Sequence, residues 1–302
     1  KNKINFIVEL QSKMEFWRIS NDKVYSVGET DKLGFEESEK LRIPDEYLQK
    51  QEFTIFRTTW GIGDWGIISA MPRLLKQKYP DCKIFIPSTK WVKKNFNIEI
   101  DIMNKIFDNN PYVDGFKDSI EGEIFHDHYR IYDLDDLDKP LVEQMLKFWQ
   151  FEEHEYKDSQ PEMYWSEEEI NLGDRIISEY VGNQDFGSLL ISKRYGTQFG
   201  KFHEDTYKND RLKLTQLLNK NNLPYFYWTY KSLKDIKFDF INNVLDMQHM
   251  NLRLQLYIKS KAKINIGNQC GTNHCVARYT DVYEVKRQKQ LGHNFVRGEF
   301  YL

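Results

Sequence analysis

Apolar positions in residues 53–151 alternate between the period of strands and the period of helices. Residues 53–60 (FTIFRTTW) form a predicted strand. The next segment is a predicted helix, because Ile67, Met71, Leu74 and Leu75 fall on one helical face. The remaining predicted elements are a strand, two weaker strands and a helix, over residues 82–89, 113–118, 126–134 and 141–151.

The same alternation restarts after residues 152–165, a polar segment with a proline that we interpret as a linker. A helix is predicted over 166–181, where Ser166 and Glu169 have the spacing of a capping box. Residues 252–262 alternate like a strand but also form a helical face, and we prefer the helix. Further strands are predicted over 188–193, 224–230, 263–269 and 281–285, and further helices over 210–221 and from 271.

These two halves predict an α/β protein with two Rossmann-like, doubly wound domains facing a cleft. The predicted boundaries are a β-rich N-terminal extension over 1–52, an N-terminal domain over 53–155 and a C-terminal domain over 156–302. Within the extension, residues 14–28 indicate two short strands around an Asn-Asp turn pair.

Composition narrows the class of protein. The 302 residues carry a net charge of −3 and have a pI near 6.2, so no nucleic-acid partner is expected. No apolar run approaches the roughly 20 residues of a membrane helix, although a peripheral membrane position stays open. The first residues lack the pattern of a signal peptide, and three cysteines form no disulfide framework. A cytoplasmic protein is therefore expected.

The first candidate site is the turn after residues 53–60. Gly61, Gly63 and Gly66 spell G-x-G-x-x-G, the dinucleotide-binding fingerprint, but the second strand ends without the acid that would hold the ribose. The glycines could instead allow a tight turn that presents Asp64. An aspartate at a helix start is usually a cap, and a catalytic role is compatible with capping.

The second candidate site is INIGNQCGTNHCVARY, residues 264–279, a strand followed by a polar turn and a helix. The backbone N–H groups of Gly271 and Thr272 would face an anion at the helix start. His274, one turn further, could donate to the same anion, or it could be a satisfied helix histidine.

Three weaker clusters carry alternative chemistry. Asp133-x-Asp135 resembles a metal-binding pair but is favoured as a solvated strand end. His126 and His128 lack an evident third ligand, so no metal site is predicted. Cys270 and His274 could form a thiol nucleophile, but no acid to orient the histidine is evident.

Two stretches resemble the heptosyltransferase-like glycosyltransferases of family nine. TTWGIGDWGIISAMPRLLKQKYPDCKIFI is similar to the family's N-terminal signature, with its Gly-Asp pair and proline-bearing helix. YIKSKAKINIGNQCGTNHCVARY is similar to the C-terminal signature x-Asp-Ser/Thr-Gly-x-x-His. SLLISKRYGTQFGKFHEDTYK, between them, resembles the family's lysine-bearing loop.

The resemblance implies a GT-B fold, with the acceptor held by the N-terminal domain and a nucleotide-sugar donor by the C-terminal one. It places Asp64 at the catalytic aspartate and Lys201 at a lysine that binds the donor phosphates. Gly271 and His274 match the C-terminal signature, whereas Gln269 and Cys270 depart from it. These departures leave the identity of the donor open.

The hypothesis is a metal-independent glycosyltransferase, inverting, with no cofactor. It moves a sugar from a nucleotide-diphosphate sugar to a glycan or lipid-linked glycan acceptor. In this hypothesis Asp64 is the base and the turn glycines Gly61 and Gly63 present it. One alternative is a nicotinamide-dependent oxidoreductase. The other is a non-catalytic sugar-nucleotide or glycan-binding protein, which the altered Gln269-Cys270 pair favours.

Overall fold

The computed structural model divides the chain into two compact units, Lys1–Tyr164 with Gly292–Val296, and Trp165–Leu291 with Arg297–Leu302. The change between them falls inside the polar segment 152–165. The structure describes residues 16–20, 23–28, 48–57, 61–96, 101–119, 124–126, 142–143, 146, 149–190, 212, 215–228, 244–246, 250–268, 270–285 and 299–301.

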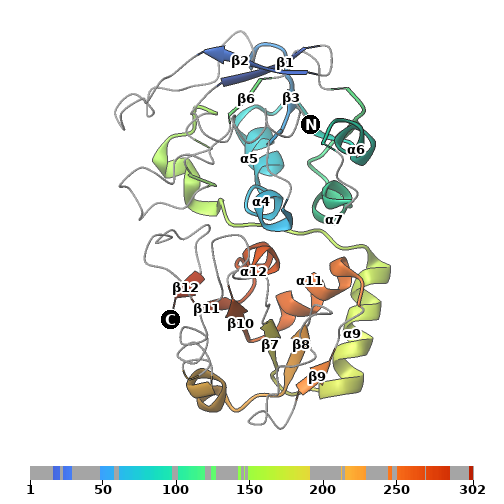
Figure 1. Ribbon diagram of the computed structural model, residues 1–302, viewed down its shortest axis with the longest axis vertical. Coiled ribbons are helices and arrows are strands. Elements are labelled where there is room, and N and C mark those ends of the chain that lie inside the picture. Colours follow the sequence, from blue (N-terminus) through green and yellow to red (C-terminus); the bar gives the residue numbers. More distant parts are fainter. Residues whose placement is uncertain are drawn as a thin grey trace. The chain divides into compact units, whose positions relative to one another are not determined.

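The first unit contains a parallel sheet whose described strands follow chain order, β3-β4-β5. These strands are β3 (Glu52–Thr54), β4 (Lys83–Pro87) and β5 (Gly115–Lys117). The helices of this unit with described bounds are α4 (Ile62–Gly66), α5 (Met71–Lys78), α6 (Thr89–Phe96) and α7 (Ile102–Phe107), with the 3₁₀ helix η2 (Glu153–Asp158) later (Figure 1). Because the strands are parallel, the segments that leave them begin at one edge of the sheet, the carboxyl edge.

The core of this unit follows the apolar pattern. All four residues of the predicted helical face are buried: Ile67, Met71, Leu74 and Leu75. The helix itself is shorter than the pattern, since α5 begins at Met71 and Pro72 occupies its first turn. A proline is favourable there because the N–H groups of a first turn have no helical partner.

A buried ion pair joins α5 to the segment that ends this unit. Arg73 Nε donates to Glu162 Oε2 at 2.8 Å, and both side chains are buried. The Glu162 N–H donates in turn to Ser69 Oγ at 2.8 Å. Burying either charge alone would be costly, so this pair fixes residues near 162 against the helix.

A second, antiparallel sheet has the order β2-β1-β6 among the described strands. β1 (Phe16–Ser20) and β2 (Lys23–Gly28) form the hairpin that the Asn-Asp turn pair predicts. β6 (Ile124–His126) pairs with β1, so the N-terminal hairpin is extended by a strand from a later part of the chain.

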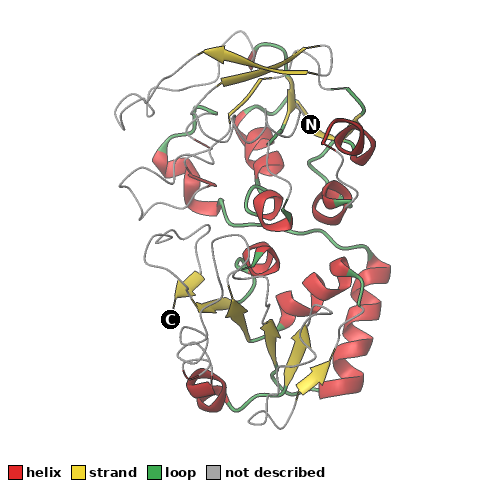
Figure 2. Ribbon diagram, in the orientation of Figure 1, coloured by secondary structure: helices red, strands yellow, loops and turns green. Residues whose placement is uncertain are grey.

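The second unit has a six-stranded sheet in the described part of the chain, ordered β12-β11-β10-β7-β8-β9, with every pairing parallel (Figures 1 and 2). Its strands are β7 (Gly187–Leu190), β8 (Tyr225–Trp228), β9 (Val244–Asp246), β10 (Ile264–Asn268), β11 (Asp281–Val285) and β12 (Glu299–Tyr301). Numbered along the unit, this is the Rossmann order 3-2-1-4-5-6. The order reverses between β7 and β10.

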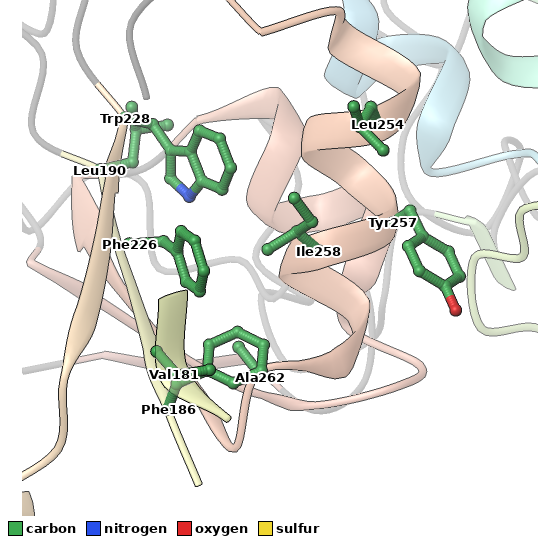
Figure 3. Close-up of a cluster of buried hydrophobic side chains, with 9 residues drawn as sticks. All are labelled: Val181, Phe186, Leu190, Phe226, Trp228, Leu254, Tyr257, Ile258 and Ala262. Atoms are coloured by element: carbon green, nitrogen blue, oxygen red, sulfur yellow. The ribbon is translucent and has the colours of Figure 1, made fainter. Parts of the chain in front are cut away.

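Both faces of this sheet are covered. One buried cluster contains Leu190, Phe226 and Trp228 from the strands and Leu254 and Ile258 from the helix beside them (Figure 3). The alternate strand residues point to a second cluster, with members Leu189, Tyr225, Tyr227 and Leu218. This alternation, with a period of two, explains why the strands are apolar almost throughout.

Three helices of this unit have described bounds: α9 (Glu167–Val181), α11 (Leu252–Lys261) and α12 (Gly271–Val276). The capping box of α9 is confirmed, since the Ser166 N–H donates to Glu169 and the Glu169 N–H donates to Ser166 Oγ. The helix preferred for residues 252–262 is confirmed as α11.

Candidate functional site

Asp64 lies in the first turn of α4, the helix that follows β3 at the carboxyl edge of the first sheet. Gly61 is the N-cap of α4, and its N–H donates to Asp64 Oδ2 at 2.9 Å. A Cβ at Gly61 would lie 2.6 Å from that oxygen. Gly61 is therefore required for the carboxylate to take this position. By accepting the Gly61 N–H, the Asp64 side chain caps the start of α4, and a catalytic role would be additional to this one.

The remainder of α4 anchors this turn. Trp65 is fully buried, and its ring meets Phe107 of α7 edge to face, with 6.1 Å between centroids. Neighbouring helix residues differ in direction by about 100°, so the burial of Trp65 leaves Asp64 half-buried. Within the described residues, the Gly61 N–H is the hydrogen-bond donor to this carboxylate, and Oδ1 accepts none.

The same geometry weakens the dinucleotide alternative. That fingerprint places its first two glycines in the turn before the helix, where backbone N–H groups meet a pyrophosphate. Here Gly63 lies inside α4, and the carboxylate of Asp64 accepts the N–H at the helix start. β4 ends at Pro87 and is followed by Ser88, not by an acid. The oxidoreductase hypothesis is not favoured.

In the second unit the candidate donor residues follow the two strands at the reversal of strand order. β10 lies beside β7, with Gly267 opposite Leu190. Ligands of open α/β sheets bind beyond the carboxyl ends of the strands at such a reversal. The turn with Cys270 and Gly271 follows β10, and the segment with Lys201 follows β7. Lys201 and Gln269 lie outside the described residues.

The residues of the turn after β10 differ in exposure. Gly271 is half-buried, while Thr272 and His274 are 2% and 5% exposed. The Cys270 thiol lies 3.3 Å from Thr272 Oγ1. Burial raises the pKa of this thiol, an effect that Lys259 only partly opposes. A raised pKa disfavours the thiolate that a nucleophile needs, so the structure gives no support to the Cys270–His274 alternative.

Three polar side chains beneath this turn were missed by the sequence analysis. Lys259, Asn273 and Glu284 are each 0% exposed. Lys259 Nζ donates to Asn273 Oδ1 at 2.6 Å, and Asn273 Nδ2 donates to Glu284 Oε1 at 3.4 Å. Burial lowers the pKa of Lys259, while nearby groups including Glu284 raise it in part. The only sequence signal was that apolar residues occupy both faces of 252–262.

The weaker metal candidates fall largely outside the described residues. The Asp133–Asp138 run and His128 are not described, and of His126 only the backbone is. Among the residues whose placement is described, no three His, Cys, Asp or Glu side chains gather as metal ligands would. No described helix combines the length and apolar character needed to cross a membrane.

No protein-family model and no curated protein matches the sequence, but solved structures resemble it. The ADP-heptose lps heptosyltransferase II of E. coli matches with 9% identity and a TM-score of 0.50, over 83% of this chain and 89% of that one. A family 9 glycosyl transferase from Veillonella parvula DSM 2008 has 8% identity and a TM-score of 0.49, over 83% and 85%. The iron-containing dodecameric glycosyltransferase TibC from enterotoxigenic E. coli H10407 has 8% identity and a TM-score of 0.46, over 82% and 63%.

The likeness to heptosyltransferase II confirms the predicted fold class. This chain is an α/β protein with parallel sheets and the fold of a GT-B glycosyltransferase.

Proposed function

We propose that this chain, with its GT-B fold, is a glycosyltransferase that moves a sugar from a nucleotide-diphosphate sugar to a glycan or glycoconjugate acceptor. The observation that carries the proposal is the placement of Asp64. Its half-buried carboxylate lies at the carboxyl edge of the first sheet, held by the Gly61 N–H at 2.9 Å. Open α/β sheets hold their ligands at that edge.

In the proposed reaction Asp64 acts as general base. It accepts the proton of an acceptor hydroxyl while the hydroxyl oxygen forms a bond to the anomeric carbon of the donor sugar. The bond from that carbon to the diphosphate breaks, and the nucleoside diphosphate leaves with the negative charge. Attack opposite the leaving group inverts the anomeric centre. A well-placed base contributes about 10²–10⁴-fold to such a step.

The donor is assigned to the second unit. Its diphosphate would bind at the reversal of strand order, with Lys201 after β7 and the N–H groups of Gly271 and Thr272 after β10. Such donors can stabilise a leaving diphosphate without a metal ion, and each is typically worth about 10²–10³-fold in rate. The proposal therefore includes a metal-independent reaction with no cofactor.

A thermal-shift screen tests the donor class. The panel is ADP, GDP, UDP and CDP, their sugars, and NAD(H). An ADP-sugar comes first because the structurally similar E. coli protein is an ADP-heptose lps heptosyltransferase II. A ligand at a hundred times its dissociation constant stabilises the protein by about 2.7 kcal/mol, which is readily measured. Stabilisation by NAD(H) alone would contradict the proposal.

Two variants then locate the donor. Lys201→Ala and Gly271→Val should each weaken binding of the nucleoside diphosphate, the second because a side chain blocks the approach to the backbone. Parent affinity in both variants would remove the proposed donor site. Binding without transfer or donor hydrolysis would instead favour the non-catalytic alternative.

A further inference from the structure

A network of buried polar groups, the buried polar network, runs from α11 to β11 through the first turn of α12. It consists of the Lys259 ammonium, the Asn273 amide and the Glu284 carboxylate, joined by contacts of 2.6 and 3.4 Å. All three are fully excluded from solvent. The network thus joins an amino group on a helix to a carboxyl group on a strand.

Such a group is not needed to build the core. Buried ion pairs often contribute little net stability compared with apolar residues of the same size, because both charges lose their hydration. The two apolar clusters of this unit are aromatic and aliphatic, and the other buried polar residues beside β10 and α12, Asn265, Thr272 and His274, are not carboxylates or amines. A buried lysine and a buried glutamate joined through Asn273 therefore call for an explanation other than stability.

The buried polar network also contacts the backbone of the turn after β10. Glu284 Oε1 accepts from the Cys270 N–H at 3.4 Å, as well as from Asn273. The Asn273 N–H donates to the Cys270 carbonyl at 3.0 Å. Residues of the buried polar network therefore hold both the N–H and the carbonyl of Cys270. Gly271 and Thr272 lie between Cys270 and Asn273, the two residues of the turn that make these contacts.

Lys259, the residue of the buried polar network that lies on α11, is fixed as well. Asn265 Nδ2, near the start of β10, donates to the Lys259 carbonyl at 2.9 Å. The Lys259 side chain therefore starts from a backbone that is tied to β10 and ends on the turn that follows β10.

We propose that Lys259 and Glu284 are positioning residues that hold the turn 270–273 in the conformation that binds the diphosphate of the donor. This inference rests on the proposed function, which assigns that turn to a nucleoside diphosphate. Neither side chain contacts the substrate. They act through Asn273 and the Cys270 N–H. Because the turn is already ordered before the donor binds, binding does not lose the free energy needed to order it.

The test is calorimetric titration with ADP, GDP, UDP and CDP on the full chain. The variants are Lys259→Met, Glu284→Gln and the double variant. Each single variant removes one end of the hydrogen-bonded series Lys259–Asn273–Glu284, so its melting temperature should fall. Because the two groups are coupled through Asn273, the double variant should lose less than the sum of the two single losses. All three should bind the preferred nucleoside diphosphate at least about tenfold more weakly, because the turn is no longer held.

The same helix offers a matched control. Arg253 on α11 is also buried, and its Nε donates to Glu169 Oε1 of α9 at 2.5 Å. Arg253→Met should lower the melting temperature but leave nucleoside-diphosphate affinity within about twofold of the parent.

The outcomes separate this inference from the proposed function. If the parent binds a nucleoside diphosphate and the folded double variant binds it equally well, the positioning role is wrong and the proposed function stands. If Arg253→Met loses as much affinity as Lys259→Met, the loss reflects general destabilisation and the role is again wrong. If the parent binds none of the four, the proposed function fails and the role with it. Should Lys259→Met not fold, the isosteric Glu284→Gln decides.

Discussion

Among single residues, Asp64 carries the sharpest expectation. Asn keeps the size of Asp and can still accept the Gly61 N–H through its amide oxygen, but it cannot take a proton. Asp64→Asn should therefore leave the melting temperature and donor affinity nearly unchanged while lowering transfer at least about a hundredfold. Steady-state transfer assays beside thermal melts measure both effects.

Asp101 provides the matched control for this variant. It also caps a helix of the first unit, since its side chain accepts from the Asn104 N–H at 3.3 Å. Asp101→Asn should turn over like the parent. Parent-like turnover of Asp64→Asn would make Asp64 a cap only, and the base would then be sought at Asp101 or at Glu99, which lies outside the described residues.

Gly61 is expected to matter only through Asp64. An added Cβ would lie 2.6 Å from Asp64 Oδ2, so Gly61→Ala should displace the carboxylate and lower transfer. In an Asp64→Ala background the same change should cost nothing further, because the clashing group is gone. A double-mutant cycle of transfer rates measures this coupling. Additive effects would show that Gly61 acts independently of Asp64.

Among the helices, α9 has a first turn whose stability should depend on pH. Burial raises the pKa of Glu169, but hydrogen bonds from Arg253 and from the Ser166 N–H outweigh it, so the folded pKa is lowered. The carboxylate therefore contributes stability above its unfolded pKa of about 4.3, and this contribution is lost as the pH falls through the folded pKa.

Glu169→Gln isolates that charge, because Gln still completes a capping box. Melting curves should show the variant below the parent at pH 7, with the two converging below about pH 4. The exposed neighbour Glu168→Gln should change stability at pH 7 by no more than about 0.5 kcal/mol. A constant difference between parent and Glu169→Gln at every pH would exclude a contribution from the charge.

The pairing of β10 with β7 depends on Gly267. A Cβ there would lie 1.9 Å from the Leu190 carbonyl oxygen, a backbone atom that cannot rotate away. Gly267→Ala should destabilise the protein by about 1–3 kcal/mol or more in urea unfolding. Gly115→Ala in β5 is the control, since its Cβ would meet the Phe85 ring at an ordinary 3.6 Å. Similar losses in both variants would contradict this reason.

For the molecule as a whole, the proposed chemistry predicts that chelators leave the rate of sugar transfer unchanged. If Lys201 and the N–H groups after β10 stabilise the leaving diphosphate, transfer should survive EDTA at parent rates. Activity lost in EDTA and restored by Mg²⁺ or Mn²⁺ would overturn the metal-independent mechanism. It would also direct attention to the Asp133–Asp138 run.

Local patterns predicted much of the fold correctly. The capping box of Ser166 and Glu169, the pairing of β1 with β2 and the helix α11 all follow from residues a few positions apart. The α/β class follows from the switching period of the apolar residues, because that period reflects backbone geometry. Asp64 and the turn after β10 were found by motif, and their roles stay predictions.

The order of the strands and the buried polar network were decided by tertiary structure alone. Lys259 and Glu284 are 25 positions apart, and their meeting depends on β10 pairing with β11 and on α12 packing beside α11. No local period encodes such a contact, because it arises when the whole sheet buries its apolar faces. The burial of Lys259 has the same origin, because it depends on the elements that pack around α11.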